Sequence, residues 1–269
     1  MKFIFDHDYH IHSHLSLCSG DPKQNNETIL QYAKDNGLKK ICLTDHFWDA
    51  KISGAPEWYQ KQGLDHIKQA KPLPQDEKIE FLFGCETELD LNCRVATDPS
   101  TFDEFDFIII PTTHMHMLGL TISLEDAQSN EKRAELWVSR LDALFAQPLP
   151  FHKIGIAHLA CFLFNNKSSE DYLNTLDLIP SEEIERVFTK AAELGVGIEL
   201  NLGDMAFRED ASERVLRMFR IAKACGCKFY LGTDAHNPAG FKKAKKYFER
   251  AIDMLDLKES DKFHIGNKK

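Results

Sequence analysis

The chain has 269 residues, with 33 Lys plus Arg and 42 Asp plus Glu, so its formal net charge is −9. Its composition, 43% hydrophobic and 28% charged, is typical of a globular protein and excludes a disordered or fibrous one. The excess of acidic residues argues against nucleic acid as a partner, because a protein surface that binds nucleic acid needs clustered basic residues.

The N-terminal sequence and the cysteines indicate in which compartment the protein resides. The N-terminal sequence carries charged residues too early for a secretory signal, and no apolar run reaches the ~20 residues of a membrane span, so we expect no membrane partner. The seven cysteines are odd in number and lack the spacing of a disulfide framework. These features predict a cytoplasmic protein with reduced thiols.

Short apolar runs alternate with helical patterns along the chain. In chain order the prediction is strand 9–12, helix 27–36, strand 40–44, strand 79–85, strand 107–111, helix 130–145, strand 154–157, helix 181–194, strand 197–200, helix 212–224, strand 229–232 and helix 241–255.

This alternation predicts the fold class. Repeated strand–helix units imply a parallel sheet, and continuous apolar strands are expected where both faces are covered. Loop signals at 72–74 and 165–169 bring no change in composition, so we expect a single domain over residues 1–269. A closed α/β barrel is the natural arrangement of seven parallel strands without exposed edges.

Residues with metal-binding side chains stand where the predicted strands end. His10 and His12 share one face of the first strand, because strand side chains alternate with a period of two. The later strands are followed by Asp45 and His46, by Glu86, by His114 and His116, by His158, and by Asp234 and His236. The carboxyl ends of the strands are the face where parallel barrels build their sites.

Any one of these residues has an ordinary explanation, since Asp45 or Asp234 could simply cap a helix. Taken together, imidazoles and carboxylates that converge at one mouth are costly to desolvate unless cations join them. The pattern therefore predicts a site for divalent metal ions.

Six short motifs occur in one order: Asp8-Tyr9-His10-Ile11-His12-Ser13, Thr44-Asp45-His46, Gly84-Cys85-Glu86, Thr113-His114, Ala157-His158 and Gly232-Thr233-Asp234-Ala235-His236. In this order they resemble the motifs of the PHP (polymerase and histidinol phosphatase) superfamily, most closely its stand-alone histidinol-phosphate phosphatases. The resemblance implies a distorted seven-stranded (β/α)7 barrel, in agreement with the strand count.

The resemblance also implies two to three divalent ions, zinc, manganese or iron, in three sites. The implied ligands are His10, His12, Glu86 and Asp234 for the first ion, Glu86, His114 and His158 for the second, and His46 and His236 for the third. Glu86, Asp234 and His236 are the implied catalytic residues, and His116 replaces His114 if the register of that loop differs.

The third site needs one more ligand from the loop after the first strand. Cys18 and Asp21 both lie there. A thiolate would favour zinc, whereas an aspartate would be more permissive of manganese or iron. Because an oxidisable thiol is a liability in the mouth of a hydrolase, Asp21 is preferred.

Substrate contacts are predicted at two positions after the sixth strand. Asn201 shares a face with the strand end, and Arg208 is placed to clamp phosphate, because a guanidinium fork matches phosphate oxygens. Three aromatic residues in the long loop after the second strand, Trp48, Trp58 and Tyr59, either line an apolar substrate wall or pack that loop.

The leading prediction is a metal-dependent phosphomonoesterase that hydrolyses a small phosphorylated metabolite, of histidinol-phosphatase type, through a hydroxide that bridges two ions. The alternatives are a phosphodiesterase or exonuclease, a protein-tyrosine phosphatase of the same superfamily, and a non-catalytic metal-binding module. The lack of a basic surface argues against the exonuclease, and the nearly complete ligand set argues against the non-catalytic module.

Overall fold

Apolar runs build the sheet of this protein, because nearly every strand is buried on both faces. The computed structural model describes residues 1–207 and 209–266. The long strands in this part are β1 (His7–Ile11), β2 (Lys40–Leu43), β4 (Glu80–Thr87), β5 (Phe107–Pro111), β6 (Ile154–Ala157), β7 (Gly197–Asn201) and β8 (Lys228–Gly232).

The strands form a nearly closed parallel barrel. Their order in the sheet is β1-β2-β4-β5-β6-β7-β8, and a short extra strand, β3 (His46–Phe47), pairs with β4. Between β1 and β8 one isolated bridge joins Ile11 to Ala235, and the Asp234 amide donates to the His10 carbonyl at 2.7 Å. The predicted α/β barrel of seven parallel strands is confirmed.

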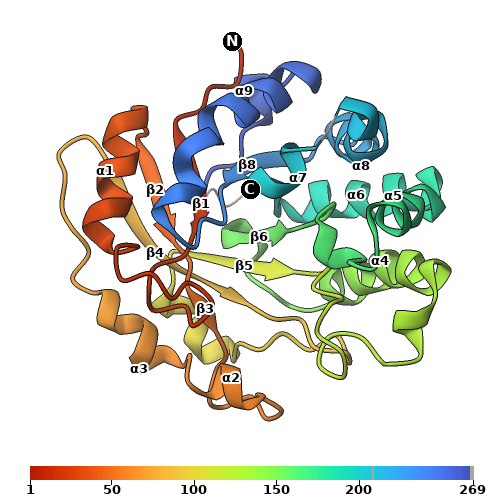
Figure 1. Ribbon diagram of the computed structural model, residues 1–269, viewed down its shortest axis with the longest axis horizontal. Coiled ribbons are helices and arrows are strands. Elements are labelled where there is room, and N and C mark those ends of the chain that lie inside the picture. Colours follow the sequence, from red (N-terminus) through yellow and green to blue (C-terminus); the bar gives the residue numbers. More distant parts are fainter. Residues whose placement is uncertain (208, 267–269) are drawn as a thin grey trace.

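Helices surround the strands, with α4, α5, α6 and α8 gathered along one side of the barrel, away from α1 (Figure 1). The described helices are α1 (Asn26–Asn36), α2 (Glu57–Gln60), α3 (Leu64–Ile67), α4 (Asn130–Phe145), α5 (Ser169–Leu178), α6 (Ser181–Leu194), α7 (Leu202–Met205), α8 (Ser212–Ala224) and α9 (Ala244–Met254). None of them is both long and apolar enough to cross a membrane.

One predicted helix begins differently in the structure, and one longer helix was not predicted. The predicted helix 241–255 begins as a 3₁₀ helix, Pro238–Lys243, before α9 starts. Helix α5 was not predicted, because the polar run before it resembles a loop. Ser168 in that run is the N-cap of α5, and its hydroxyl accepts from the Asp171 amide at 3.0 Å.

Aromatic side chains fill the half of the barrel in which the strands begin, called the lower half here, and the carboxyl ends of the strands form the upper half. Phe107 and Tyr230 are fully buried there, with ring centroids 5.2 Å apart and edge to face. At Gly155 a Cβ atom would lie only 2.5 Å from the Phe107 ring and 2.6 Å from the Tyr230 ring, so glycine leaves room for both. This aromatic plug, completed by Tyr9 and Phe263, leaves the polar residues only the upper end of the interior.

Candidate metal centre

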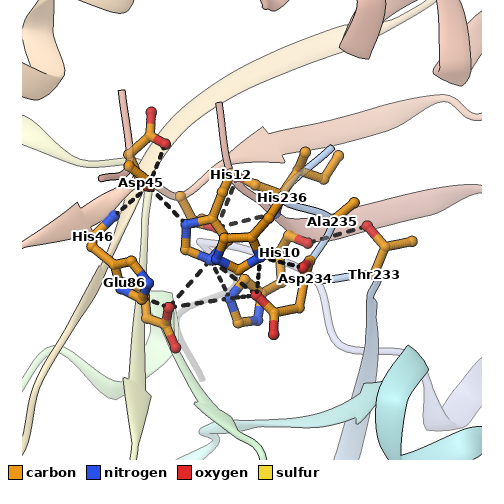
Figure 2. Close-up of polar contacts among 12 residues, drawn as sticks. His10, His12, Asp45, His46, Glu86, Thr233, Asp234, Ala235 and His236 are labelled. Carbon is orange, nitrogen blue, oxygen red and sulfur yellow. Dashed lines mark hydrogen bonds and ion pairs between the residues drawn. The ribbon is translucent and has the colours of Figure 1, made fainter. Parts of the chain in front are cut away.

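The first group of candidate ligands brings together residues from near both ends of the chain and from β4, at the carboxyl ends of the strands (Figure 2). His10 and His12 come from β1 and the residue after it, Glu86 from β4, and Asp234 from the segment after β8. The His12 Nε2 atom lies 3.2 Å from Glu86 Oε2 and 3.0 Å from Asp234 Oδ1. The corresponding His10 Nε2 distances are 3.5 and 3.4 Å, so all four side chains converge on one point.

Glu86 also faces a second group of imidazoles. Its Oε1 atom lies 3.2 Å from His158 Nε2 and 3.8 Å from His114 Nε2. Its Oε2 atom, on the side of the first group, lies 3.1 Å from His46 Nδ1. The two oxygens of one buried carboxylate therefore point into two different sets of donors, which is the arrangement expected of a bridging ligand.

A third group consists of imidazoles alone. His12, His46 and His236 present ring nitrogens that lie within 4.8 Å of one another. The rings of His12 and His236 are stacked, with centroids 4.1 Å apart and planes 21° apart. His12 is thus shared between the first and third groups, which the sequence did not predict.

The charges of these groups depend on one another. Burial alone would raise the pKa of Glu86, but His10 and His46 hold it well below its ordinary value. Burial would lower the pKa of His10, yet Glu199, Asp234 and Glu86 raise it well above its ordinary value. The carboxylates thus demand positive charge at the imidazoles, and metal ions can supply that charge in place of protons.

Buried polar atoms without hydrogen bonds show that these residues fit metal ions. Glu86 Oε2, Asp234 Oδ1 and His46 Nδ1 are all buried and lack a hydrogen-bond partner. Atoms left in this way cost free energy unless a cation takes up their lone pairs. Imidazole nitrogens with carboxylate oxygens are a donor set that suits divalent zinc, manganese or iron.

Two buried glutamates that the sequence analysis did not single out orient the ligands. Glu199 lies on β7, and its Oε1 atom accepts from His10 Nδ1 at 2.6 Å, while its Oε2 atom accepts from the His158 amide at 3.1 Å. A Cβ atom at Gly232 would overlap Glu199 Oε1, so this contact requires glycine there. Glu88 Oε1 lies 2.9 Å from His114 Nδ1. Such outer carboxylates fix ring orientation and tautomer in metal sites.

A further aspartate holds the backbone rather than a candidate ion. Asp45 accepts from the Ser13 amide at 2.7 Å and from the Ser16 hydroxyl at 2.6 Å. The Ser16 hydroxyl in turn lies 3.0 Å from His12 Nδ1. Asp45 therefore shapes the loop after β1 and through it the orientation of His12.

Two of the candidate ligands have a strained backbone. His158 and Asp234 have φ angles of 61° and 52°, in the left-handed region that residues other than glycine rarely adopt. Conformations of this kind cost of order 1–3 kcal/mol each and persist where the surrounding structure imposes them. Here they turn the side chains that follow β6 and β8 back over the barrel mouth.

Beyond His12, the loop after β1 contributes no ligand to the three groups within the part of the chain that the structure describes. The Asp21 carboxylate accepts from the Lys23 amide at 2.9 Å instead. Cys18 lines the cavity beside His46 and His236. Its partly exposed thiol is still desolvated by the surrounding protein, which together with the charges of Glu86 and Asp234 raises its pKa to about 12.

The other predicted residues are placed as follows. His114 belongs to the second group, whereas His116 is half-buried on the wall of the cavity. Asn201 is buried, and its amide is engaged within the chain, donating to Glu199 Oε2 at 3.2 Å and accepting from the Gly203 amide. Arg208 lies outside the described residues.

A cavity of ≈ 320 Å³ opens above the ligand groups. Its floor is formed by Glu86, Asp234 and the imidazoles, and its wall includes Trp58 and Tyr59. Trp58 is 37% exposed, and its ring packs edge to face on His46 with a centroid distance of 5.3 Å. Tyr59 also packs against the buried Trp48, with ring centroids 5.4 Å apart, so these aromatic residues both line the cavity and pack their loop.

Comparison with known proteins identifies the family. The family model of the PHP domain matches residues 8–203. The chain belongs to the PHP domain family. The matched residues contain every ligand of the second group, whereas Asp234 and His236 lie beyond them and are brought to the site by β8.

Two solved structures share the fold. The histidinol phosphate phosphatase HisK of Lactococcus lactis subsp. lactis, solved with zinc, L-histidinol and phosphate, has 17% identity and a TM-score of 0.56, over 96% of this chain and 98% of that one. A candidate histidinol phosphatase, HisK of Listeria monocytogenes, has 12% identity and a TM-score of 0.60, over 90% and 99%. No curated protein matches the chain in sequence.

Proposed function

We propose that this PHP protein hydrolyses the phosphate monoester of a small metabolite, in the manner of a histidinol-phosphate phosphatase, with two to three divalent ions. The observation that carries the proposal is Glu86, whose two buried oxygens face separate groups of imidazoles beneath an open cavity. That arrangement fits an enzyme in which two cations act on one substrate.

The residues that would hold the ions are the three groups described above. His10, His12, Glu86 and Asp234 would hold one ion, Glu86, His114 and His158 a second, and His12, His46 and His236 a third, for which Asp21 stays the predicted further ligand. Divalent ions bound there would lower the pKa of a coordinated water and neutralise phosphate oxygens.

The remaining residues prepare the site for that chemistry. Glu199 and Glu88 hold the rings of His10 and His114 by their second nitrogens, so that the first nitrogens stay directed at Glu86. Trp58 and Tyr59 keep water away from one side of the cavity and strengthen the electrostatic interactions inside it. Arg208 stays a predicted phosphate contact.

The size of the cavity supports a small substrate. A volume of ≈ 320 Å³ is at the low end of the range of roughly 300–1,000 Å³ for small-molecule sites. The Lactococcus enzyme that shares the fold was solved with L-histidinol and phosphate, which supports a phosphorylated amino alcohol as one substrate to try. A cytoplasmic location stays a prediction from the cysteine pattern.

The test is hydrolysis by the full chain with added manganese or zinc. The panel contains histidinol phosphate, other small phosphomonoesters, a phosphotyrosine peptide, a phosphate diester and a single-stranded oligonucleotide. We expect release of phosphate from small monoesters and little from the others. Hydrolysis of the diester or oligonucleotide alone would replace the proposal with a phosphodiesterase, and inactivity on all substrates with stoichiometric metal would leave a metal-binding module.

A further inference from the structure

A second hollow adjoins the ligand groups on the side away from Trp58. It has a volume of ≈ 580 Å³ and lies between the β7–α7 turn, the segment after β8 and the 3₁₀ helix Pro238–Lys243. Asp234 and His236 line both this hollow and the cavity above the ligand groups. The two spaces are therefore neighbours that share the side chains of two candidate ligands.

Lys242 and Lys243 give this hollow a positive wall. Residues 241–247 contain four lysines and no acidic residue, in a chain whose net charge is −9. Among the residues lining the hollow that the structure describes, the one carboxylate is Asp234, which already faces His10 and His12. The anionic character of the whole protein is thus reversed at this point.

Neither lysine is paired with another residue in the part of the chain that the structure describes. Other lysines on the surface are engaged by carboxylates: Lys40 lies 2.7 Å from Glu80, and Lys68 lies 2.7 Å from Glu104. Within residues 1–207 and 209–266, no ion pair or hydrogen bond engages the ammonium group of Lys242 or Lys243. An unpaired pair of cations beside a site for anionic substrates is available to a ligand.

The segment that carries these lysines is held firmly in place. The Phe241 ring stacks on Tyr32 with a centroid distance of 3.9 Å and planes 11° apart. The side-chain Oδ1 atom of Asn237 accepts from the amides of Ala239 and Gly240 at 3.0 and 3.2 Å. At Gly240 a Cβ atom would lie 3.0 Å from Ala235 Cβ, so the segment packs closely against the loop that carries Asp234.

We propose that Lys242 and Lys243 form a subsite for a second anionic group of the substrate, a carboxylate or a second phosphate. This inference rests on the proposed function and narrows it: the substrate is a phosphomonoester that carries a further negative charge. The hydrolysed phosphate is held at the candidate metal centre, and the second anion lies in the hollow. Lysine suits this role because its ammonium group binds carboxylate or phosphate as a point charge.

The experiment compares three sets of substrates with matching carbon chains of increasing length. Alkyl phosphates carry one anionic group, ω-carboxyalkyl phosphates add a carboxylate, and alkanediol bisphosphates add a phosphate. They are assayed with the full-length protein, the double variant Lys242→Met/Lys243→Met, and the control Lys245→Met/Lys246→Met. The control removes two charges from the same region but from residues that do not line the hollow.

We expect the protein to prefer one of the two series that carry a second anionic group over alkyl phosphates of equal length. The Lys242→Met/Lys243→Met variant should raise KM for that series by about tenfold, with kcat and the KM of alkyl phosphates unchanged. The control variant should behave like the wild type. The preferred series shows whether the second anion is a carboxylate or a phosphate.

Two results would overturn the inference while leaving the proposed function intact. They are equal KM values for all three series in the wild type, or equal effects of the two double variants. If no phosphomonoester is hydrolysed at all, the proposed function fails, and calorimetry decides the subsite separately. A carboxyalkyl phosphonate should then bind the wild type and the control but not the Lys242→Met/Lys243→Met variant, and equal binding to all three would refute the subsite.

Discussion

At the lower end of the barrel, Phe107 and Tyr230 are fully buried among other aromatic rings. At the upper end, Glu86 and His10 are buried to the same extent among other charged groups. The lower end is held by packing of its rings, because apolar surfaces need only contact one another, and the Tyr230 hydroxyl is buried there without a hydrogen bond from the described residues. At the upper end Glu86 Oε2 and Asp234 Oδ1 face imidazoles but make no hydrogen bond, and a bound cation would take up their lone pairs.

The largest expected effect comes from removing the central charge at the upper end without changing its volume. Glu86→Gln should lower kcat roughly 10³-fold and reduce bound metal, because one carboxylate serves two ligand groups. The measurements are metal content and kcat. Glu80→Gln, on the exposed start of the same strand, is the control and should resemble the wild type. Near-normal turnover in Glu86→Gln would refute the bridging role.

The next prediction removes volume at the lower end without changing charge. Phe107→Ala should lower the free energy of unfolding by about 3–5 kcal/mol, the usual cost of emptying a buried aromatic site. Metal bound per folded molecule should stay normal. Urea unfolding is the measurement, with Leu178→Ala, at a position 43% exposed, as the control. Metal loss without loss of stability would mean that the two ends are not separate.

The third prediction concerns the ligand that the sequence assigns to the third site. If Asp21 joins His12, His46 and His236, Asp21→Asn should lower occupancy of one ion and reduce kcat about 10²-fold, while Cys18→Ser changes little. Metal content and kcat are compared in both variants side by side. The reverse order would make Cys18 the ligand, and wild-type values in both would leave three imidazoles to hold that ion.

The smallest effect is expected at a residue that holds a ligand instead of an ion. Glu199→Gln should reduce metal affinity or kcat by about tenfold. One of the two oxygens that accept from His10 Nδ1 and from the His158 amide would become an NH2 group, which is a donor facing a donor. Competition with a metal-binding dye measures the affinity. Glu193→Gln, on the surface of α6, is the control. A loss as large as that of Glu86→Gln would place Glu199 among the ligands.

The barrel was predictable because its strands are continuous apolar runs and its helices end at glycines such as Gly37 and Gly195, both left-handed. Convergence of His10, Glu86 and His158 followed from their positions at strand ends. The roles of Glu88 and Glu199 did not, since they depend on the pairing of distant side chains. An isolated carboxylate inside the apolar strand β7 was nevertheless a usable signal, because burying it alone is costly.

The join between β1 and β8 sets the order in which this protein can be assembled. Asp8 accepts from the Thr233 amide at 3.0 Å, across 225 positions of sequence. His10 and Asp234 therefore meet only after the last strand has docked, and a nascent chain that still lacks β8 has no complete first group. Ions bound to this group would stabilise the closed barrel relative to every partly folded form, and their binding would therefore accompany the final step of folding.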